Sequence, residues 1–384
     1  FREGDAGDSL YFLVRGRLQV WAGANNSDPQ HKTHLLGEVV PGDSVGEVGL
    51  ISDKPRMAGI RAIRDSLLIR IDRAGFESLA EQHPALLMKL AANVGSLLQA
   101  RNAAPVSRSL KTISLLPLMS DTQVSTYCDE FCEELSSQNS VLFVSPDNLA
   151  ALGAPVSDLG KDGTLSDQLK HWLSDQEDEY DFVLYRCPPG DSPWTRFAIR
   201  QSDILLMVAD ASQDPVSVIW EPENKAGSDT TVGRRALVLL QDDRLVIKNT
   251  HRWLKNRQLN FHLHMEKGYK KDVQRAVRVV TGTATGLVMG GGAARGLAAL
   301  GVFKALVEAG IEIDWLGGTS IGSIMAGGVA AGLSPDQAIE NSRLSFKIGK
   351  PFGDFTFPVI SLLRGNRMKR LLYQYLDHQI EDLA

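Results

Sequence analysis

The middle third of the chain, residues 111–278, alternates short apolar runs with amphipathic helical patterns. The apolar runs predict strands at Thr112–Leu116, Val141–Val144, Phe182–Tyr185, Ile204–Val208 and Ala236–Gln241, and helical spacing predicts helices at Ser125–Leu135 and Leu165–Leu173. Parallel strands need crossover connections, which are usually helices, so this alternation indicates a mostly parallel sheet with helices packed on it. The pattern restricts the central region to an α/β fold.

Length, charge and cysteine spacing limit the rest of the chain. Its 384 residues predict two or three domains at roughly 100–200 residues each. The 41 Lys and Arg against 46 Asp and Glu leave a net charge of -5, so we expect no nucleic-acid partner. Cysteines at 128, 132 and 187 match neither a disulfide framework nor a zinc site, which favours a reducing, cytoplasmic compartment.

Two further features concern anchoring and completeness. The longest uncharged apolar stretch, residues 321–334, is rich in glycine and shorter than the roughly 18 residues of a membrane-spanning helix. We therefore expect no spanning segment. Because Phe1 opens within a strand-and-turn pattern, we expect the chain to be a fragment of a longer protein.

Residues 1–101 open with short β-rich runs that glycine and aspartate interrupt. The runs predict strands at Leu10–Val14, Leu18–Trp21, His34–Val39 and Ser66–Asp72, and thus an antiparallel barrel or roll. From Arg73 to Arg101 apolar residues recur at helical spacing, which predicts a helical tail closing this first domain. Residues 102–110 have weak periodicity and are expected to form a linker.

The segment from Gly46 to Arg56, called the cassette below, contains the elements of an anion-binding site. Backbone amides at the start of a short helix and an arginine side chain both attract phosphate. Its companions, in chain order, are Gly4-Asp5, Gly7-Asp8, the run Tyr11 to Gly16, and Gly42-Asp43. In this order the motifs resemble those of cyclic nucleotide-binding domains. The resemblance implies that Gly46, Glu47 and Arg56 are the candidate nucleotide-binding residues, with Arg56 on the phosphate and Glu47 on a sugar hydroxyl.

The cassette departs from that family directly after the arginine. Met57, Ala58 and Gly59 stand where the family has a small residue followed by Thr or Ser. Two interpretations stay open, a working cyclic nucleotide sensor and a structural or degenerate regulatory domain. We expect cyclic nucleotides to bind weakly or not at all.

The central α/β region resembles ATPases of the chromosome-partitioning type. The resemblance rests on Asp181–Tyr185, Cys187–Gly190 and Ser202–Val208. The first predicted strand, however, leads into Pro117–Thr122 instead of a glycine-rich loop ending in lysine, which is what holds a triphosphate. We therefore predict a degenerate P-loop-like domain that serves as a scaffold or couples its neighbours.

A glycine cluster follows a predicted strand at Gly286–Met289 and precedes a predicted helix at Leu297–Ala309. Consecutive glycines at such a turn leave backbone amides free, at the positive end of a helix, to receive a developing oxyanion. Glycine-rich turns of this kind also bind phosphates, so this turn alone does not separate the two functions.

A second motif follows the predicted strand Ile313–Leu316. Gly318-Thr319-Ser320-Ile321-Gly322 has the G-x-S-x-G pattern of a nucleophile elbow, in which small residues permit a tight turn that lifts the serine hydroxyl clear of the sheet. A strand before it, a helix after it and the glycine turn upstream make the pattern specific.

The glycine turn and the elbow together resemble patatin-like phospholipases, and the order of all three regions resembles neuropathy target esterase and its bacterial relatives. The resemblance implies a serine esterase that hydrolyses phospholipids or lysophospholipids without metal or cofactor. It assigns Ser320 as the nucleophile of a Ser-Asp dyad, Gly318 and Gly322 as the elbow glycines, and Gly290, Gly291, Gly292 and Ala293 as the oxyanion turn that Arg295 orders. Many relatives have a glycine where Ala293 stands, and a positive φ there would cost alanine about 1 kcal/mol.

The dyad aspartate of that family lies in an Asp-Gly-Gly or Asp-Gly-Ala motif, and no residue after Ser320 matches it. We expect this base beyond Ala384, so residues 1–384 alone should be inactive. The resulting domain prediction is 1–101 cyclic nucleotide-binding-like, 102–110 linker, 111–280 α/β without a P-loop and 281–384 the first half of a patatin-type α/β hydrolase. A non-catalytic, cyclic-nucleotide-responsive regulator remains the alternative.

Two other clusters contain residues with possible functional chemistry. His262 and His264, with His251 nearby, suggest a metal pair on one strand face, but no acidic or cysteine ligand lies at suitable spacing, so core-edge histidines are favoured. Between Asn341 and Leu376, seven basic residues interleave with aromatics. This composition suits either an anionic membrane surface, where a lipid substrate would be collected, or a solvated helix face with its aromatics packed inward.

Overall fold

The computed structural model covers residues 1–384. It describes residues 1–23, 34–52, 54–83, 110–155, 166–218, 220, 233–243, 247–345, 347, 353–356, 364–375 and 380–383. These residues form two compact units, one of 1–118 with 139–207 and 219–236, the other of 119–138 with 208–218 and 237–384. The predicted helical tail beyond residue 83 and nearly all of the predicted linker fall outside the described residues.

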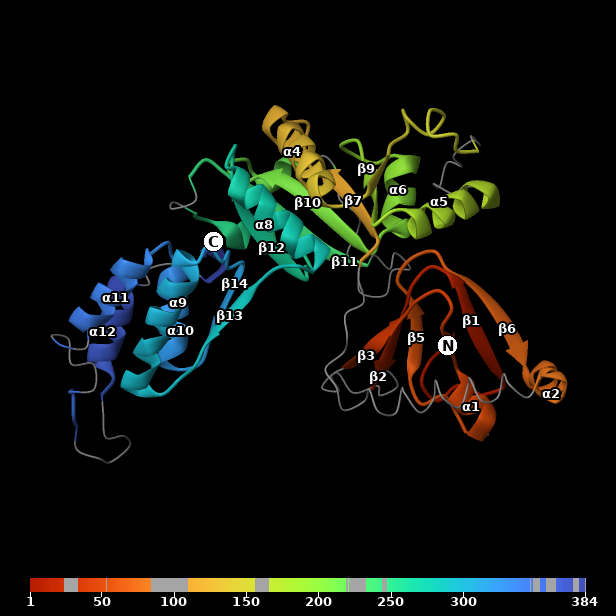
Figure 1. The fold of residues 1–384 in the computed structure, drawn as a ribbon, viewed down its shortest axis with the longest axis horizontal. Helices are drawn as coiled ribbons and strands as arrows, with labels where there is room; N and C mark the ends of the chain where they lie inside the picture. Colours follow the sequence, from red (N-terminus) through yellow and green to blue (C-terminus); the bar gives the residue numbers. More distant parts are fainter. Residues whose placement is uncertain are drawn as a thin grey trace. The chain divides into compact units, whose positions relative to one another are not determined.

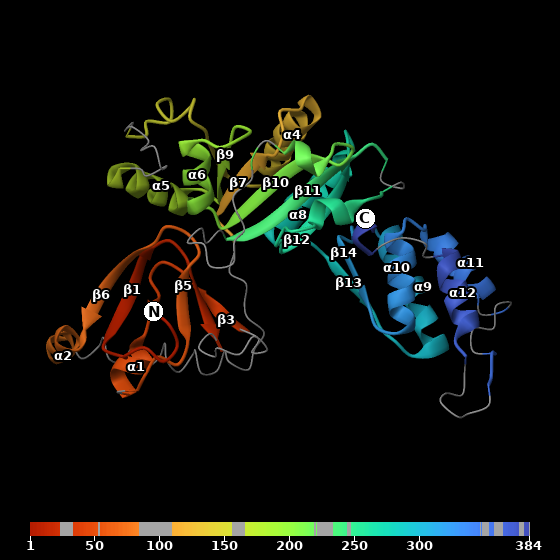
Figure 2. The same cartoon turned by 180° about the vertical axis from the view of Figure 1, so that it is seen from behind.

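The amino-terminal region is an antiparallel roll of two three-stranded sheets, as predicted (Figures 1 and 2). One sheet has the order β4-β1-β6 and the other β3-β2-β5. The bounds are β1 Ser9–Arg15, β2 Leu18–Ala22, β3 His34–Val39, β4 Ser44–Val45, β5 Gly59–Ala62 and β6 Leu67–Asp72. Leu13, Leu18, Val39 and Val45 form its buried core.

Two helices belong to the described part of this roll, α1 at Glu47–Ser52 and α2 at Arg73–Gln82. The helix α2 begins where Asp72 accepts a hydrogen bond from the amide of Gly75, which satisfies one of the free donors of the first turn. The switch from strand to helix therefore falls at Arg73, where the periodicity of the sequence changes.

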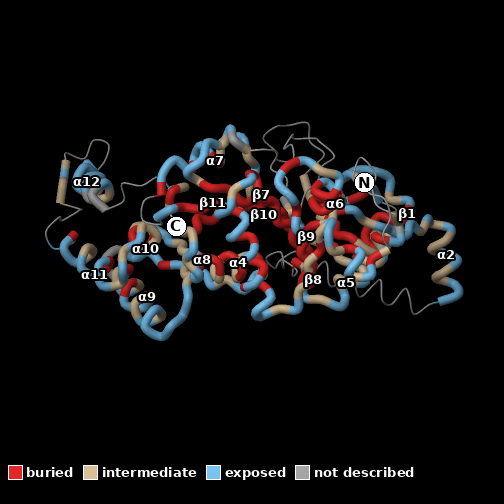
Figure 3. The backbone as a smooth tube through the Cα atoms, turned by 90° about the horizontal axis from the view of Figure 1, so that it is seen from above, coloured by how far each residue is buried: buried red, intermediate tan, exposed pale blue. Residues whose placement is uncertain are grey.

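The central region is built on a six-stranded sheet in the order β12-β11-β10-β7-β9-β8. Its strands are β7 Thr112–Pro117, β8 Val141–Val144, β9 Phe182–Arg186, β10 Ile204–Asp210, β11 Arg234–Gln241 and β12 Phe261–Glu266. β9 pairs in parallel with both β7 and β8, which confirms the predicted parallel sheet. Every residue of β7 and β10 is buried, and Figure 3 shows these strands among the buried segments.

The helices of this region are α4 Thr122–Gln138, α5 Asp167–Glu179, α6 Pro193–Gln201, α7 Thr250–Leu254 and α8 Lys270–Thr281, with a 3-10 turn η1 at Pro215–Ser217. Local chemistry sets several ends. Ser192 caps α6 through the amide of Thr195, and Pro193 occupies its first position. α8 ends at Gly282, whose φ of 79° is left-handed, so a glycine stands where other residues would be strained.

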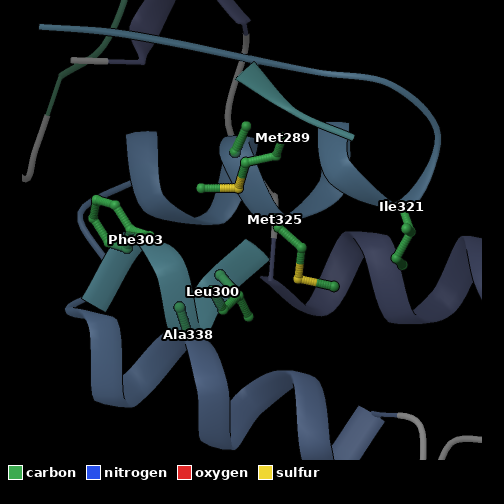
Figure 4. Packing of buried hydrophobic residues seen from close by; sticks show 7 residues of the cluster. Met289, Leu300, Phe303, Ile321, Met325 and Ala338 are labelled. Carbon is green, nitrogen blue, oxygen red and sulfur yellow. The ribbon is translucent and has the colours of Figure 1, made fainter. Parts of the chain in front are cut away.

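The last region begins with a two-stranded parallel sheet of β13 Gly286–Met289 and β14 Trp315–Gly318. It continues with the 3-10 turns η2 Ala293–Leu297 and η4 Ile380–Asp382 and the helices α9 Ala298–Glu308, α10 Ile321–Ala330, α11 Pro335–Leu344 and α12 Asn366–Tyr375. Side chains from β13, α9, α10 and α11 share one core, which Figure 4 shows around Met289, Leu300 and Met325.

The predicted strand Ile313–Leu316 is wrong by two residues, because β14 runs from Trp315 to Gly318. The amide of Asp314 donates to the Thr285 carbonyl ahead of the ladder, and the ladder itself first pairs Gly286 with Trp315. Pairing with β13 therefore extends the strand through two glycines that β-propensity disfavours. The fold class predicted from the sequence is otherwise confirmed.

Candidate active site

Ser320 lies directly after β14 and directly before α10. Its φ of 55° and ψ of −123° place a non-glycine residue in a strained backbone conformation, and its side chain is exposed. Among the other non-glycine residues that the structure describes, only Asn249 and Asn256 have a positive φ, and asparagine tolerates it better than serine does. The serine is thus held on a sharp turn with its hydroxyl at the surface.

The glycines around Ser320 are there because the turn has no room for a side chain. A Cβ on Gly318 would lie 2.4 Å from the backbone carbon of Gly322, and one on Gly322 would lie 2.1 Å from the carbonyl oxygen of Met289. Real Cβ atoms do not approach backbone so closely. Any residue other than glycine would push α10 away from β13.

The glycine turn lies against this serine. A Cβ on Gly291 would lie 3.2 Å from the Cβ of Ser320 and 3.1 Å from the Thr319 carbonyl oxygen. Within the described residues, the amides of Gly291 and Gly292 donate to no backbone oxygen. Gly291 therefore lies against the Ser320 side chain, and among the described residues its amide and that of Gly292, just before η2, have no backbone acceptor.

The positive φ of the turn falls on Gly292, at 131°, and Ala293 is the first residue of η2. The strain considered for Ala293 therefore falls on the neighbouring glycine, which tolerates it. Arg295 contributes through its backbone, since its amide donates to the Gly292 carbonyl at 3.1 Å while its side chain is exposed. Gly296 packs against Ile321, where a Cβ would lie 2.2 Å from Cγ2.

No side chain of the described residues accepts a hydrogen bond from the Ser320 hydroxyl. Asp336 pairs with Lys304 at 2.5 Å, and Asp354 accepts the amide of Arg367 at the start of α12. Asp382 accepts the amide of Thr250 at 3.0 Å. The three aspartates after Ser320 that the structure describes are therefore engaged elsewhere, whereas Asp377 and His378 lie outside the described residues.

One buried acid at the other end of β14 was not singled out by the sequence. Asp314, just before β14, has a side chain only 1% exposed and pairs with Arg278 of α8. The available signal was an aspartate standing alone inside an otherwise apolar strand pattern.

In the roll, Arg56 and Glu47 come close together, but both are buried. Arg56 donates to the carbonyl of Gly46 at 2.8 Å and to the carbonyl and hydroxyl of Ser9 at 2.7 and 3.2 Å, and its guanidinium lies 4.3 Å from the ring centroid of Phe1. Burial, the largest cause, raises the pKa of Glu47 above its usual value, and Arg56 opposes this shift. Glu47 Oε2 has no hydrogen-bond partner within the described chain.

The histidine pair is used structurally. The Nε2 atoms of His262 and His264 lie 3.1 and 2.9 Å from the Glu381 carbonyl oxygen, and burial lowers the pKa of His264 to about 4. No group of three or more acidic, cysteine or histidine side chains able to hold a metal occurs in the described residues. Helices in the same part of the chain are all too short or too polar to cross a bilayer.

Three known families match successive parts of the chain. Residues 1–83 match the cyclic nucleotide-binding domain, residues 109–287 match the Neuropathy Target Esterase family P-loop like domain, and residues 287–377 match the patatin-like phospholipases. The succession is the one that the sequence motifs predicted.

Individual relatives agree with this succession. Lysophospholipase nte1 of Aspergillus fumigatus is 29% identical over 463 residues, covering 100% of this chain and 30% of that protein. Patatin-like phospholipase domain-containing protein 6 of Mus musculus is 28% identical over 435 residues, covering 100% of this chain and 31% of its own length. The chain thus spans about a third of the length of the curated relatives that it matches.

Among solved structures, a cyclic nucleotide-binding domain from Methylobacillus flagellatus is 27% identical and covers 26% of this chain and 55% of its own, with a TM-score of 0.23. The family matches confirm the resemblance found in the sequence. In chain order, its parts are therefore similar to a cyclic nucleotide-binding domain, to the P-loop like domain of the Neuropathy Target Esterase family and to patatin-like phospholipases.

Proposed function

We propose that the protein is a serine esterase that hydrolyses acyl esters of phospholipids or lysophospholipids, with Ser320 as its nucleophile. The observation that carries the proposal is the strained, exposed Ser320 against Gly291, in a glycine turn whose amides at Gly291 and Gly292 have no backbone acceptor in the described chain. The names of the relatives, lysophospholipase and patatin-like phospholipase, support the substrate class.

The reaction would proceed in two steps. Ser320 Oγ attacks the acyl carbonyl carbon while a base takes the hydroxyl proton, and the amides of Gly291 and Gly292 stabilise the negative oxygen that forms. The alcohol portion of the lipid leaves with a proton, and water then attacks the acyl-serine to release the fatty acid. The base is an aspartate that the family resemblance implies, which no Asp-Gly motif after Ser320 in residues 1–384 supplies.

A lipid substrate is presented at a membrane surface, and α12 has suitable chemistry for contact with anionic lipid. It carries Arg367, Lys369 and Arg370, and its Tyr373 is exposed, with Lys369 Nζ 5.8 Å from the ring centroid. Cationic residues beside an interfacial aromatic favour anionic headgroups. We propose on this basis that the protein acts at an anionic membrane surface, and its free cysteines support a cytoplasmic location. Lys350 and the aromatics Phe346, Phe352 and Phe357 of the predicted cluster lie outside the described residues.

The test is hydrolysis of a lysophospholipid by the full-length protein and its Ser320→Ala variant, with labelling by a fluorophosphonate as the second readout. We expect Ser320→Ala to abolish both. Ser125→Ala is the matched control, because Ser125 is also an exposed helical serine but lies on α4, away from the elbow. Turnover by Ser320→Ala at the wild-type rate would overturn the assignment.

A further inference from the structure

An ion pair between a partly exposed arginine, Arg278, and a buried carboxylate, that of Asp314, lies at the amino end of β14. Asp314 receives hydrogen bonds from Arg278 Nη2, 2.6 Å from Oδ1, and from Arg278 Nε, 3.1 Å from both carboxylate oxygens. Its Oδ2 also accepts the amide of Thr285 at 2.9 Å. Both oxygens of this buried carboxylate are therefore satisfied, one mainly by α8 and one by the residue that precedes β13.

Thr285 and Asp314 are joined in both directions. The Thr285 carbonyl accepts the amides of Asp314 at 2.8 Å and Trp315 at 3.2 Å. The strand ladder begins at the next pair, Gly286 with Trp315, and ends at Met289 with Gly318. The contacts among Arg278, Asp314 and Thr285 thus lie directly before the first residue pair of the ladder.

The ladder itself specifies its register weakly. It has four residue pairs, and β14 reads Trp-Leu-Gly-Gly with no alternation of buried and exposed residues. At its far end the next residues are the glycine turn and Thr319-Ser320. A slip of one residue would move Ser320 by about 3.3 Å relative to the turn, which is enough to separate the nucleophile from the amide donors.

We propose that Arg278, on the P-loop-like domain, is a positioning residue for the hydrolase: by holding Asp314 against Thr285 it fixes the register of the two strands that carry the oxyanion turn and the nucleophile. The proposal rests on the proposed esterase function. It gives the helix α8 a role in a reaction that takes place at the opposite end of these strands (Figure 1).

Arginine suits this role better than lysine does. Its planar fork binds both carboxylate oxygens, whereas lysine offers a single point charge. Hydrogen bonding to Asp314 raises the pKa of Arg278, so the side chain stays charged. Two neighbouring contacts hold the same end of β14 through Trp315. The centroid of its ring lies 6.2 Å from the ring centroid of Phe261 on β12, and the Arg275 guanidinium lies 6.0 Å from the Trp315 ring centroid.

The same helix offers a matched control. Lys271 of α8 pairs with Glu312 at 3.4 Å, and both side chains are more than half exposed. Glu312 lies two residues before Asp314, so this pair links the same two segments. An exposed ion pair contributes little, and its loss should not change the register.

The experiment measures fluorophosphonate labelling of Ser320 in the full-length protein, as a rate constant and as a final labelled fraction. We expect Arg278→Gln to lower the rate constant by about 10–100-fold with the final fraction unchanged, because misplaced reacting groups cost rate. Arg278→Lys should be intermediate, and Lys271→Gln should label at the wild-type rate. For lysophospholipid hydrolysis, kcat should fall with the labelling rate while KM stays constant.

A merely structural role would lower the final fraction and leave the rate constant of the folded molecules unchanged, and that result would overturn the proposal. If Arg278→Gln does not fold, Arg278→Lys decides: a rate equal to that of Lys271→Gln overturns the proposal and a slower one supports it. If the Arg278 and Lys271 variants are labelled at equal rates and Ser320→Ala is inactive, the positioning role is rejected and the esterase assignment stands. Hydrolysis by Ser320→Ala instead rejects the esterase assignment.

Discussion

The nucleophile elbow and the nucleotide cassette are both glycine-containing loops that enter a helix, and they differ in where their polar groups are directed. At the elbow, the amides of Gly291 and Gly292 have no backbone acceptor in the described chain, and the Ser320 side chain is exposed. In the roll, the Arg56 guanidinium is buried and donates to protein oxygens of Ser9 and Gly46.

The elbow is thus arranged to receive a ligand, whereas in the cassette the arginine side chain forms hydrogen bonds within the protein. Free donors and a strained backbone cost stability, and a folded chain keeps them where a substrate is to be bound or transformed. A buried arginine that already has acceptors must give them up before it can bind phosphate. Changes at the elbow should therefore affect chemistry, whereas changes in the cassette should affect stability.

The largest expected effect is that of Gly322→Ala. Its Cβ would lie 2.1 Å from the Met289 carbonyl oxygen, so α10 must move off β13 and carry Ser320 with it. We expect fluorophosphonate labelling of the full-length protein to slow by about 100-fold. Gly301→Ala is the control, because a Cβ there, on the exposed face of α9, meets no atom within 4 Å. Labelling of Gly322→Ala at the control's rate would mean that the tight turn does not position the serine.

The next effect is on the stability of the roll. Arg56→Ala removes three hydrogen bonds, to the carbonyls of Ser9 and Gly46 and to the Ser9 hydroxyl, two of which are buried. We expect the free energy of unfolding to fall by about 3 kcal/mol, which chemical denaturation would measure. Arg61→Ala removes the same charge from an exposed position on β5 and should change little. If the two variants are equally stable, the hydrogen bonds of Arg56 do not stabilise the roll, and the proposed difference between the cassette and the elbow is wrong.

A third test concerns the ligand of the cassette. Because Arg56 is engaged and the exposed Met57 replaces a small residue, cyclic AMP and cyclic GMP should not bind at micromolar concentration. Isothermal titration calorimetry on the full-length protein measures this directly. Micromolar binding that disappears in Arg56→Lys would show instead that the cassette is a working sensor.

The sequence predicts a structural feature well when the residues that determine the feature lie close together in the chain. The strands β3, β8 and β13 have the bounds that their apolar runs predicted, and the elbow follows from five consecutive residues. In both cases the signal and the structure occupy the same short segment. The catalytic and nucleotide roles assigned to residues remain predictions, since geometry alone does not test them.

The sequence does not reveal pairings between distant segments. Arg278 and Asp314 are 36 positions apart, and neither hydrophobic periodicity nor a motif links an arginine in a helix to an aspartate before a strand. A second distant contact, between Asp314 and Thr285, explains why the predicted bounds of β14 were wrong, because it precedes the first ladder pair and sets where the strand starts. Likewise, Arg56 matched the family pattern, but only the structure shows that its donors are used by Ser9 and Gly46.

The smallest expected effect is a pH dependence confined to the cassette. Burial raises the folded-state pKa of Glu47 above its unfolded value of about 4.5, so this carboxyl favours the folded state at low pH and loses that contribution as the pH rises through its folded-state pKa. Glu47→Gln has no such group, so its stability relative to wild type should improve as the pH rises from about 4.5 towards neutrality. Denaturant unfolding at several pH values measures the difference, with exposed Glu77→Gln on α2 as the control that should keep the wild-type trend. A difference that does not change with pH would mean that Glu47 is hydrated in the folded protein, and the cassette would then be as open to a ligand as the elbow.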